Sequence, residues 1–392
     1  MMSKEQFGLY SVGFATVLLL SGLISASIGM QFTVNLPDQE NHCRAQYAVH
    51  HAAAVALVCF GMIGIAVAFS FLPREIGGFD AYLVSELAVP VTVAVTFYSL
   101  RDLLIRLAYS ERRETAVLKS NMVVGFFNLG ALFSISRLLS AAPSAEIALY
   151  VYAVGQMVGC LSGVSLGALP WHGICWTQVS GAFAESWKGG RWAVISSLAY
   201  NVRTQAHSFL IPPLLGVRVL AEINAARILV TPAVMAIPPF SDVLMPRLAE
   251  RRQQGLLKLA RASSIAIGGL SAVTLLYSSA LMLSLNWLLP LIFGETYRNI
   301  DQLVFGWCAV TVFLALRNGL SLALQVVRAF RGLMLANVFA ALWTLILFRP
   351  FVEHFGVLGA IYAIAAVEML LCVVLLLMLF FLMRVTAKEP LI

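Results

Sequence analysis

Three arginines lie inside apolar segments of the second half of the chain: Arg203, Arg227 and Arg317. A charged side chain at the centre of a bilayer costs between about 3 and over 10 kcal/mol, so it normally faces a cavity or a partner inside the protein. The planar guanidinium donates paired hydrogen bonds to phosphate oxygens and keeps its charge. These residues could therefore bind a pyrophosphate group and sugar hydroxyls. The alternative is that each arginine pairs with a carboxylate or with helix-end carbonyls and serves only the structure.

Arg203 has polar neighbours at helical spacing. It shares a helix face with His207, because side chains four residues apart lie on the same side of a helix. This face is cationic, and more so when His207 is protonated, although a packing role suits His207 better than proton transfer. We predict a substrate-binding group with Arg203 as its first contact, made of six residues: Arg203, His207, Arg227, Arg317, Asn201 and Gln205.

Glu368 is the most deeply placed carboxylate, in the middle of the last apolar segment. Burial favours the protonated form of a carboxyl group, so Glu368 could titrate and couple transport to an ion. It could equally be the counter-ion of Arg317 within the second half. The sequence leaves both interpretations open.

The sequence has no spacing typical of a metal site or a catalytic centre. Its six cysteines are scattered without a C-x-x-C pair, which argues against a zinc site and a disulfide framework. It also lacks the G-x-S-x-G, H-E-x-x-H and Walker motifs. We therefore expect no metal, no cofactor and no enzymatic activity.

The composition indicates that lipid is the solvent of this chain. Of its 392 residues, 60% are hydrophobic and only 11% are charged, whereas soluble domains have about 45–50% apolar and about 25% charged residues. A spanning helix needs about 20 predominantly apolar residues. This criterion predicts an all-α polytopic membrane protein with about eleven spans, near residues 9–30, 51–72, 82–100, 120–141, 147–168, 192–215, 220–245, 262–292, 302–324, 332–348 and 357–383.

The distribution of Lys and Arg orients these segments. Alternating loops carry 17 of the 26 basic residues on one side and 6 on the other, with three left inside the spans. One of the loops on the rich side contains Arg101, Arg106, Arg112, Arg113 and Lys119. Cytoplasmic loops are enriched in Lys and Arg, so the rich side is cytoplasmic. We predict a cytoplasmic C-terminus and an external N-terminus. The same rule accounts for the net charge of +7, and we expect no nucleic-acid partner.

One glycine series predicts close helix packing. Gly155, Gly159, Gly163 and Gly167 recur every four residues. A G-x-x-x-G run lets a neighbouring helix approach closely, so we expect packing at these positions rather than a binding site.

Several short motifs follow one another along the chain. Glu5–Tyr10 resembles a turn between apolar helices, and Leu214–Gly216 resembles a similar turn in a second half of similar plan that begins near Arg191. The other motifs are Gly190–Ala193 with Asn201–Gln205 as the start of a second lobe, Ala225–Arg227, Ser241–Ala249 as a helix end, Leu289–Tyr297 as a loop, and Phe355–Ala360 as the start of a late helix. In this order the motifs resemble those of the polysaccharide-transport flippases in the multidrug/oligosaccharidyl-lipid/polysaccharide (MOP) exporter superfamily, in which the turn at Glu5–Tyr10 follows the first helix.

The resemblance implies two six-helix lobes around a central cavity and alternating-access transport. The substrate it implies is an isoprenoid-pyrophosphate-linked oligosaccharide for surface polysaccharide in a bacterial cytoplasmic membrane. Implied partners are this lipid-linked sugar, membrane lipid and polysaccharide polymerase or assembly proteins. We predict an N-terminal lobe over 1–170, a cytoplasmic interfacial linker over 171–191 and a C-terminal lobe over 192–392. Because few residues precede the Phe-Gly-Leu-Tyr motif, we expect five and six spans, with the family's first helix lost or encoded upstream.

Two other functions remain open. A cation-coupled drug exporter of the same superfamily would have acidic residues dominating its cavity. A non-transporting scaffold of an exopolysaccharide assembly would need no substrate-binding residues.

Overall fold

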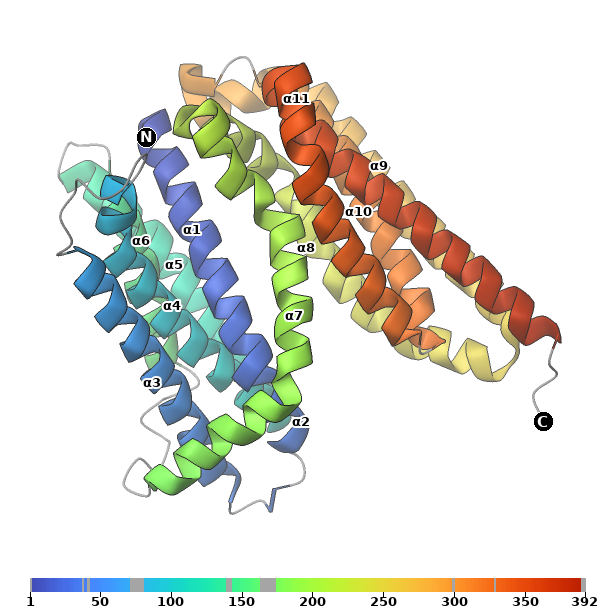
Figure 1. Cartoon of the computed structure of the whole chain (residues 1–392). Helices are drawn as coiled ribbons and strands as arrows, with labels where there is room; N and C mark the ends of the chain where they lie inside the picture. Colours follow the sequence, from blue (N-terminus) through green and yellow to red (C-terminus); the bar gives the residue numbers. More distant parts are fainter. Residues whose placement is uncertain are drawn as a thin grey trace. The chain divides into compact units, whose positions relative to one another are not determined.

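The computed structural model describes residues 2–36, 39–40, 43–70, 81–138, 143–162, 174–297, 300–327 and 329–388. These residues form helices joined by short connections, and the chain divides into two compact units, residues 1–201 and 202–392 (Figure 1). The prediction of an all-α polytopic membrane protein is confirmed. The lobe and linker limits predicted at 170 and 192 stay a prediction.

The described residues of the first unit form six α-helices before the one that leads into the second unit. They are α1 (Lys4–Ile24), α2 (Met30–Asn35), α3 (Arg44–Ser70), α4 (Ala81–Ser110), α5 (Glu114–Leu138) and α6 (Ala145–Leu161). A five-residue π-helix, Ser25–Gly29, joins α1 to α2. The long helix α7 (Trp176–Leu215) begins in this unit and continues past Asn201 into the next.

In the part of the second unit that the structure describes, the end of α7 is followed by four α-helices: α8 (Val217–Gln253), α9 (Leu256–Phe293), α10 (Asp301–Val326) and α11 (Phe330–Lys388). A 3₁₀ turn, Gly294–Tyr297, follows α9. Gly356 breaks α11 into two consecutive helices, because its backbone is not helical there. We call them the first and second parts of α11.

Within the described residues, eight helices are long and apolar enough to cross a membrane. The last of these, Phe330–Leu382, contains both parts of α11 and so covers two predicted spans. The helix Ala145–Leu161 is apolar but shorter, and the second half of α7 covers the predicted span 192–215. Together these helices account for the five and six predicted spans.

Each unit is organised around one helix. In the first unit α4 contacts α1, α3, α5 and α6, and in the second α10 contacts α8, α9 and α11. Both central helices carry small residues that allow this packing, such as Ala94 on α4 and Ala315 on α10, each 0% exposed. Side chains on α4 and α10 are therefore the ones most enclosed by protein.

Two connections depend on glycine. Gly294 ends α9 with φ 59° and ψ −147°, and Gly356 breaks α11 with φ 59° and ψ −134°. Residues with a side chain rarely adopt such a conformation. The helix start predicted at Phe355–Ala360 is therefore present, whereas the loop predicted over Leu289–Tyr297 is wrong for its first five residues, because α9 continues to Phe293 and only Gly294–Tyr297 lies outside it.

Two other motif interpretations are wrong. Glu5–Tyr10 is helical from its first residue, because Ser3 caps α1 and its hydroxyl accepts a hydrogen bond from the Gln6 N–H at 3.2 Å. No helix ends within Ser241–Ala249, since α8 continues to Gln253. By contrast, Gly216, with φ 90°, does separate α7 from α8 as the Leu-Leu-Gly motif predicts.

Close helix contacts explain two of the four periodic glycines. A Cβ on Gly155 would lie 2.0 Å from Asn128 Oδ1, and one on Gly159 would lie 2.5 Å from a Val124 methyl group on α5. Gly163 and Gly167 lie outside the described residues. At Gly190 on α7, a Cβ would lie 2.5 Å from the Ser27 carbonyl oxygen in the π-helix.

Candidate functional site

The buried charge cluster consists of Arg203 on α7, Arg317 on α10 and Glu368 on the second part of α11, with exposed fractions of 2%, 8% and 3%. Arg203 Nη1 donates to Glu368 Oε1. Arg317 Nε lies 2.8 Å from Glu368 Oε2, within ion-pair distance. Glu368 is thus held between two arginines from different helices. Its contact with Arg317 is the counter-ion contact that one of the two sequence-based interpretations predicts.

The charge balance of this cluster is positive. Two guanidinium groups face one carboxylate, so the three side chains carry a net charge of about +1 when Glu368 is ionised. A charge removed from water is tolerated when it is paired, and here a single carboxylate pairs with both arginines. The cluster can therefore attract a further anionic group.

A second polar group, the histidine cluster, consists of Gln205 and His207 on α7, Asn224 and Arg227 on α8, and Trp307 on α10. Arg227 Nη1 lies 3.2 Å from His207 Nε2 and 3.4 Å from Gln205 Oε1. A guanidinium has only donors, so the contact with Arg227 needs His207 Nε2 as an acceptor, whereas Asn224 Oδ1, 3.3 Å from the same nitrogen, needs it as a donor.

Trp307 packs against the Arg227 and His207 side chains of the histidine cluster. Its indole N–H donates to the Ile223 carbonyl at 3.0 Å, and the Arg227 guanidinium carbon lies 5.4 Å from its ring centroid. The His207 ring meets Trp307 edge to face at 5.5 Å. Sequence reasoning missed Trp307 because an isolated aromatic residue in an apolar segment has no distinguishing signal.

Five of the six predicted binding residues thus belong to these two clusters, and Asn201 does not. Its amide donates to the Ser197 carbonyl at 2.9 Å, and it packs against Gly22 of α1, where a Cβ would lie 3.0 Å from Asn201 Nδ2. Asn201 therefore serves contacts within the first unit. Whether any of the six binds substrate stays a prediction.

The first unit contains a buried arginine that the sequence analysis placed in a loop. Arg101 lies inside α4 and is 9% exposed. Its guanidinium donates to Gln156 Oε1 at 2.9 Å, to Ser120 Oγ at 3.3 Å and to Asn121 Oδ1. The loop assignment is wrong because α4 continues to Ser110, nine residues beyond Arg101. Arg106 also lies within α4.

An internal sequence repeat shows that Arg101 of the first unit corresponds to Arg317 of the second. The segment Phe97–Arg101 on α4 and the segment Phe313–Arg317 on α10 share the pattern F-x-x-L-R. The segments 148–160 on α6 and 360–372 on α11 align without a gap and are identical at five of thirteen positions. In this alignment Gln156 corresponds to Glu368.

The two copies of the repeat make the same contacts, each within its own unit. Arg101 donates to Gln156 as Arg317 pairs with Glu368. The thiol of Cys160 donates to the Phe97 carbonyl at 3.6 Å, and that of Cys372 donates to the Phe313 carbonyl at 3.3 Å. One difference is chemical: the first unit has a neutral amide where the second has a carboxylate. This repeat was the signal that could have located the buried arginine.

A polar contact network surrounds the π-helix of the first unit. Asp102 Oδ2 accepts hydrogen bonds from Ser25 Oγ and from Arg106 Nε, both at 2.9 Å. Arg106 Nη2 also donates to Ser25 Oγ at 2.9 Å. The two charged residues are four apart on α4, so α4 presents an ion pair to the irregular segment.

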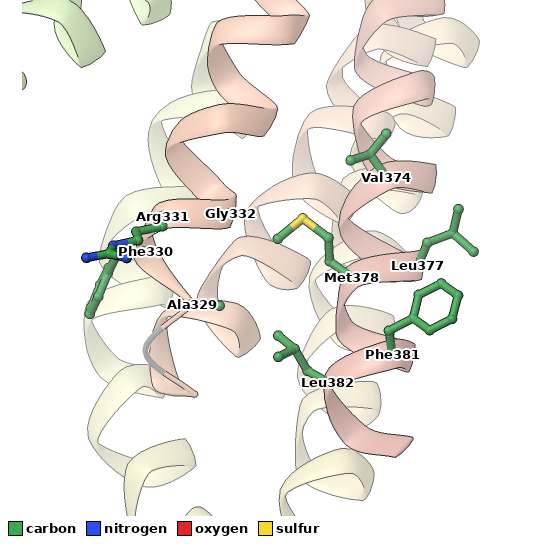
Figure 2. Close-up of a pocket in the computed structure, with 9 residues that line it drawn as sticks. All are labelled: Ala329, Phe330, Arg331, Gly332, Val374, Leu377, Met378, Phe381 and Leu382. Atoms are coloured by element: carbon green, nitrogen blue, oxygen red, sulfur yellow. The ribbon is translucent and has the colours of Figure 1, made fainter. Parts of the chain in front are cut away.

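The second unit also has an apolar pocket of about 830 Å³ between the ends of the two parts of α11. Figure 2 shows the Met378 side chain reaching toward Gly332, while the Arg331 side chain extends away from Met378. The other lining residues are apolar, so this pocket offers little to a charged headgroup. Among the described residues, no group of three His, Cys, Asp or Glu side chains could hold a metal ion.

Two titratable groups outside the spans have shifted pKa values. Burial, followed by the charge of Glu222, raises the pKa of Tyr297 to about 12. Hydrogen bonds from the Thr177 hydroxyl and from the N–H groups of Gln178 and Thr177 lower the pKa of the exposed Cys175 thiol. Cys175 precedes α7 and is the exposed free cysteine of the chain.

Sequence comparison gives no relative: no protein-family profile and no curated protein matches the chain. Solved structures share its fold. An inward-facing multidrug resistance MATE family transporter of the MOP superfamily aligns with a TM-score of 0.74 at 14% identity, covering 100% of this chain and 97% of that one. Lipid II flippase MurJ, in an inward closed conformation, aligns with a TM-score of 0.74 at 11% identity, covering 100% and 88%.

The eukaryotic MATE transporter AtDTX14 aligns with a TM-score of 0.63 at 14% identity, covering 96% of this chain and 87% of that one. All three alignments extend over almost the whole chain. The chain therefore has the fold of MATE and MurJ transporters. This agrees with the fold that the sequence motifs implied.

Proposed function

We propose that this chain is a flippase or exporter of the MOP superfamily that moves an isoprenoid-pyrophosphate-linked oligosaccharide across a bacterial cytoplasmic membrane by alternating access. The observation that carries the proposal is the buried charge cluster, in a fold shared with MurJ and MATE transporters. A net positive cluster inside a membrane protein suits a pyrophosphate, because guanidinium groups bind phosphate oxygens through paired hydrogen bonds. The isoprenoid tail would stay in lipid.

Arg203 is our first choice for the pyrophosphate contact. Arg317 also contacts Glu368, so a change at Arg203 still leaves the carboxylate with a partner. Arg227, His207 and Gln205 would contact sugar hydroxyls, for which amide and imidazole groups are suitable donors and acceptors. Orientation follows from the basic loops, with the C-terminus cytoplasmic and the N-terminus outside.

The test is complementation of a deletion strain by Arg203→Gln and Arg203→Lys. We expect Arg203→Gln to abolish export of the surface polysaccharide and to make its lipid-linked unit accumulate, while the protein stays in the membrane. Arg203→Lys should restore export only partly, because an ammonium keeps the charge but lacks the planar fork. Normal export with Arg203→Gln would show that Arg203 does not make the pyrophosphate contact.

The same strains distinguish the other two functions. In a cation-coupled drug exporter Glu368 would bind the coupling ion, whereas its contacts with two arginines favour a counter-ion role. Drug sensitivity without accumulation of a lipid-linked unit would support the exporter. A scaffold would support polysaccharide export with Arg203→Gln as well as with the unchanged chain, provided that both reach the membrane in equal amounts. Assembly or polymerase partners would be detected by co-purification.

A further inference from the structure

A small pocket of about 500 Å³ lies where α8 ends and α9 begins, in the second unit. Arg247, Arg251 and Gln254 line it beside the apolar side chains of Leu244 and Ile265. Both helices are long enough to span a membrane, and we place their shared end, which carries the basic residues, on the headgroup side of the membrane. The pocket is thus apolar toward the membrane interior and polar toward its end.

The two arginines of this pocket are four residues apart near the end of α8, so they lie on the same helix face. Arg251 Nη1 donates to Gln254 Oε1 at 3.0 Å, which orients its guanidinium. Glu250 also lines the pocket, which leaves a net charge of about +1 there. Lys258 and Arg261 lie close by in sequence at the start of α9 and add positive charge outside the pocket.

The floor of the pocket is fixed by packing. Leu248, which lines it, is 3% exposed and belongs to a small core with Leu259, Leu322 and Val326. Arg252 donates to the Val326 carbonyl at 2.8 Å, which ties the end of α8 to the end of α10. The arginines are therefore presented from a supported helix end.

We propose that this pocket binds the phosphate headgroup of an anionic phospholipid, with Arg247 and Arg251 on the phosphate and an acyl chain along Leu244 and Ile265. Basic pockets at the ends of membrane helices bind such headgroups, because the charge matches the phosphate and the apolar wall matches the chain. If the basic loops are cytoplasmic, as proposed above, the lipid comes from the cytoplasmic leaflet. The lipid would be a bound component of the transporter and distinct from its substrate.

The test measures lipid bound to the purified full chain in detergent by native mass spectrometry, with phosphatidylglycerol and phosphatidylcholine as probes. We expect phosphatidylglycerol to bind more tightly. The double variant Arg247→Gln/Arg251→Gln should weaken it by roughly 25-fold, about fivefold for each arginine, since one basic residue near an anionic lipid contributes about 1 kcal/mol. The matched control Lys258→Gln/Arg261→Gln removes the same charge outside the pocket and should change binding by about twofold or less.

A second variant tests the space of the pocket independently of its positive charge. Ala266→Phe would fill the space while every arginine stays in place, and we expect it to weaken phosphatidylglycerol binding as well. Melting temperature in phosphatidylcholine checks that each variant is folded. Equal losses in both double variants would mean diffuse surface attraction and would overturn the proposal. So would unchanged binding in both pocket variants, or displacement of the lipid by inorganic phosphate at equal concentration.

Discussion

Arg203 and Glu368 form an ion pair in which each residue is at least 97% removed from solvent. They come from α7 and from the second part of α11, which are separated by more than 160 residues in sequence. Because Glu368 also contacts Arg317, one carboxylate serves two cations. The contribution of Glu368 to stability can therefore be separated from that of either arginine.

Replacing Glu368 by Gln should destabilise the protein strongly. The change removes the carboxylate that both buried guanidinium groups contact, and breaking a buried pair costs about 3–5 kcal/mol. The measurement is the melting temperature of the purified protein in detergent. Glu353→Gln is the control, because its partner Arg349 is highly exposed and their pair should contribute little. Equal melting temperatures for the two variants would contradict the role of Glu368.

Replacing Gln156 by Glu should be tolerated. Arg101 Nη1 already lies 2.9 Å from Gln156 Oε1. The new carboxylate would therefore form an ion pair with Arg101, as Glu368 does with Arg317 in the second unit. We expect Gln156→Glu to keep the melting temperature within a few degrees. Adding Arg101→Gln to this variant should lower it steeply, because the carboxylate would then be buried without a cation. If Arg101→Gln lowered the melting temperature equally in the unchanged chain and in the Gln156→Glu variant, Arg101 and the new carboxylate at position 156 would not form the ion pair expected from the second copy of the repeat.

Replacing Arg101 by Gln in the unchanged chain should also be destabilising. Arg101 joins α4 to Ser120 and Asn121 on α5 and to Gln156 on α6. A buried polar group left without its partner costs about 1–3 kcal/mol. Arg113→Gln is the control, since Arg113 pairs with Glu111 on the surface. If Arg101→Gln and Arg113→Gln lowered the temperature of thermal unfolding by the same small amount, the hydrogen bonds of Arg101 would not contribute to stability as proposed.

Two glycines of α11 should differ in their tolerance of alanine. A Cβ on Gly359 would lie 1.9 Å from the Phe351 carbonyl oxygen, and backbone cannot yield without distorting the helix. A Cβ on Gly332 would meet the end of the flexible Met378 side chain. We expect Gly359→Ala to cost about 1–3 kcal/mol or more and Gly332→Ala to cost little. Thermal unfolding in detergent measures both, and a reversed order would contradict the packing described here.

Cys175 should react selectively with maleimides. It is exposed, whereas Cys43 is half-buried and Cys59, Cys160, Cys308 and Cys372 are buried. Since its pKa is lowered, the reactive thiolate forms at a lower pH than for an ordinary cysteine. Thr177→Val removes the hydroxyl hydrogen bond, so the curve of alkylation rate against pH should move to higher pH.

The same thiol tests the orientation. If the basic loops are cytoplasmic, a membrane-impermeant maleimide should label Cys175 in inside-out vesicles and leave intact cells unlabelled. Cys175→Ser measures the background from the other cysteines. Labelling of intact cells alone would reverse the orientation.

The sequence predicts the helices well because span length and apolar composition are local properties. The buried arginines of the second unit are also local signals, since Arg203 and Arg317 are the only Lys, Arg, Asp or Glu residues within the predicted spans 192–215 and 302–324. Arg101 was misplaced because Arg106, Arg112 and Arg113 follow it and together look like a loop. The contact between Arg203 and Glu368 depends on how α7 and α11 pack, which the pattern of a single helix does not contain.

Gly294 and Gly356 share one conformation, with φ 59° in both and ψ −147° and −134°. Reversing both signs gives angles close to those of polyproline II, which any ordinary amino acid adopts. A Cβ at either glycine would meet nothing within 4 Å. The obstacle to a side chain at these two corners is therefore handedness and not space. A D-alanine introduced there by chemical synthesis would fit, while its mirror image would strain the chain.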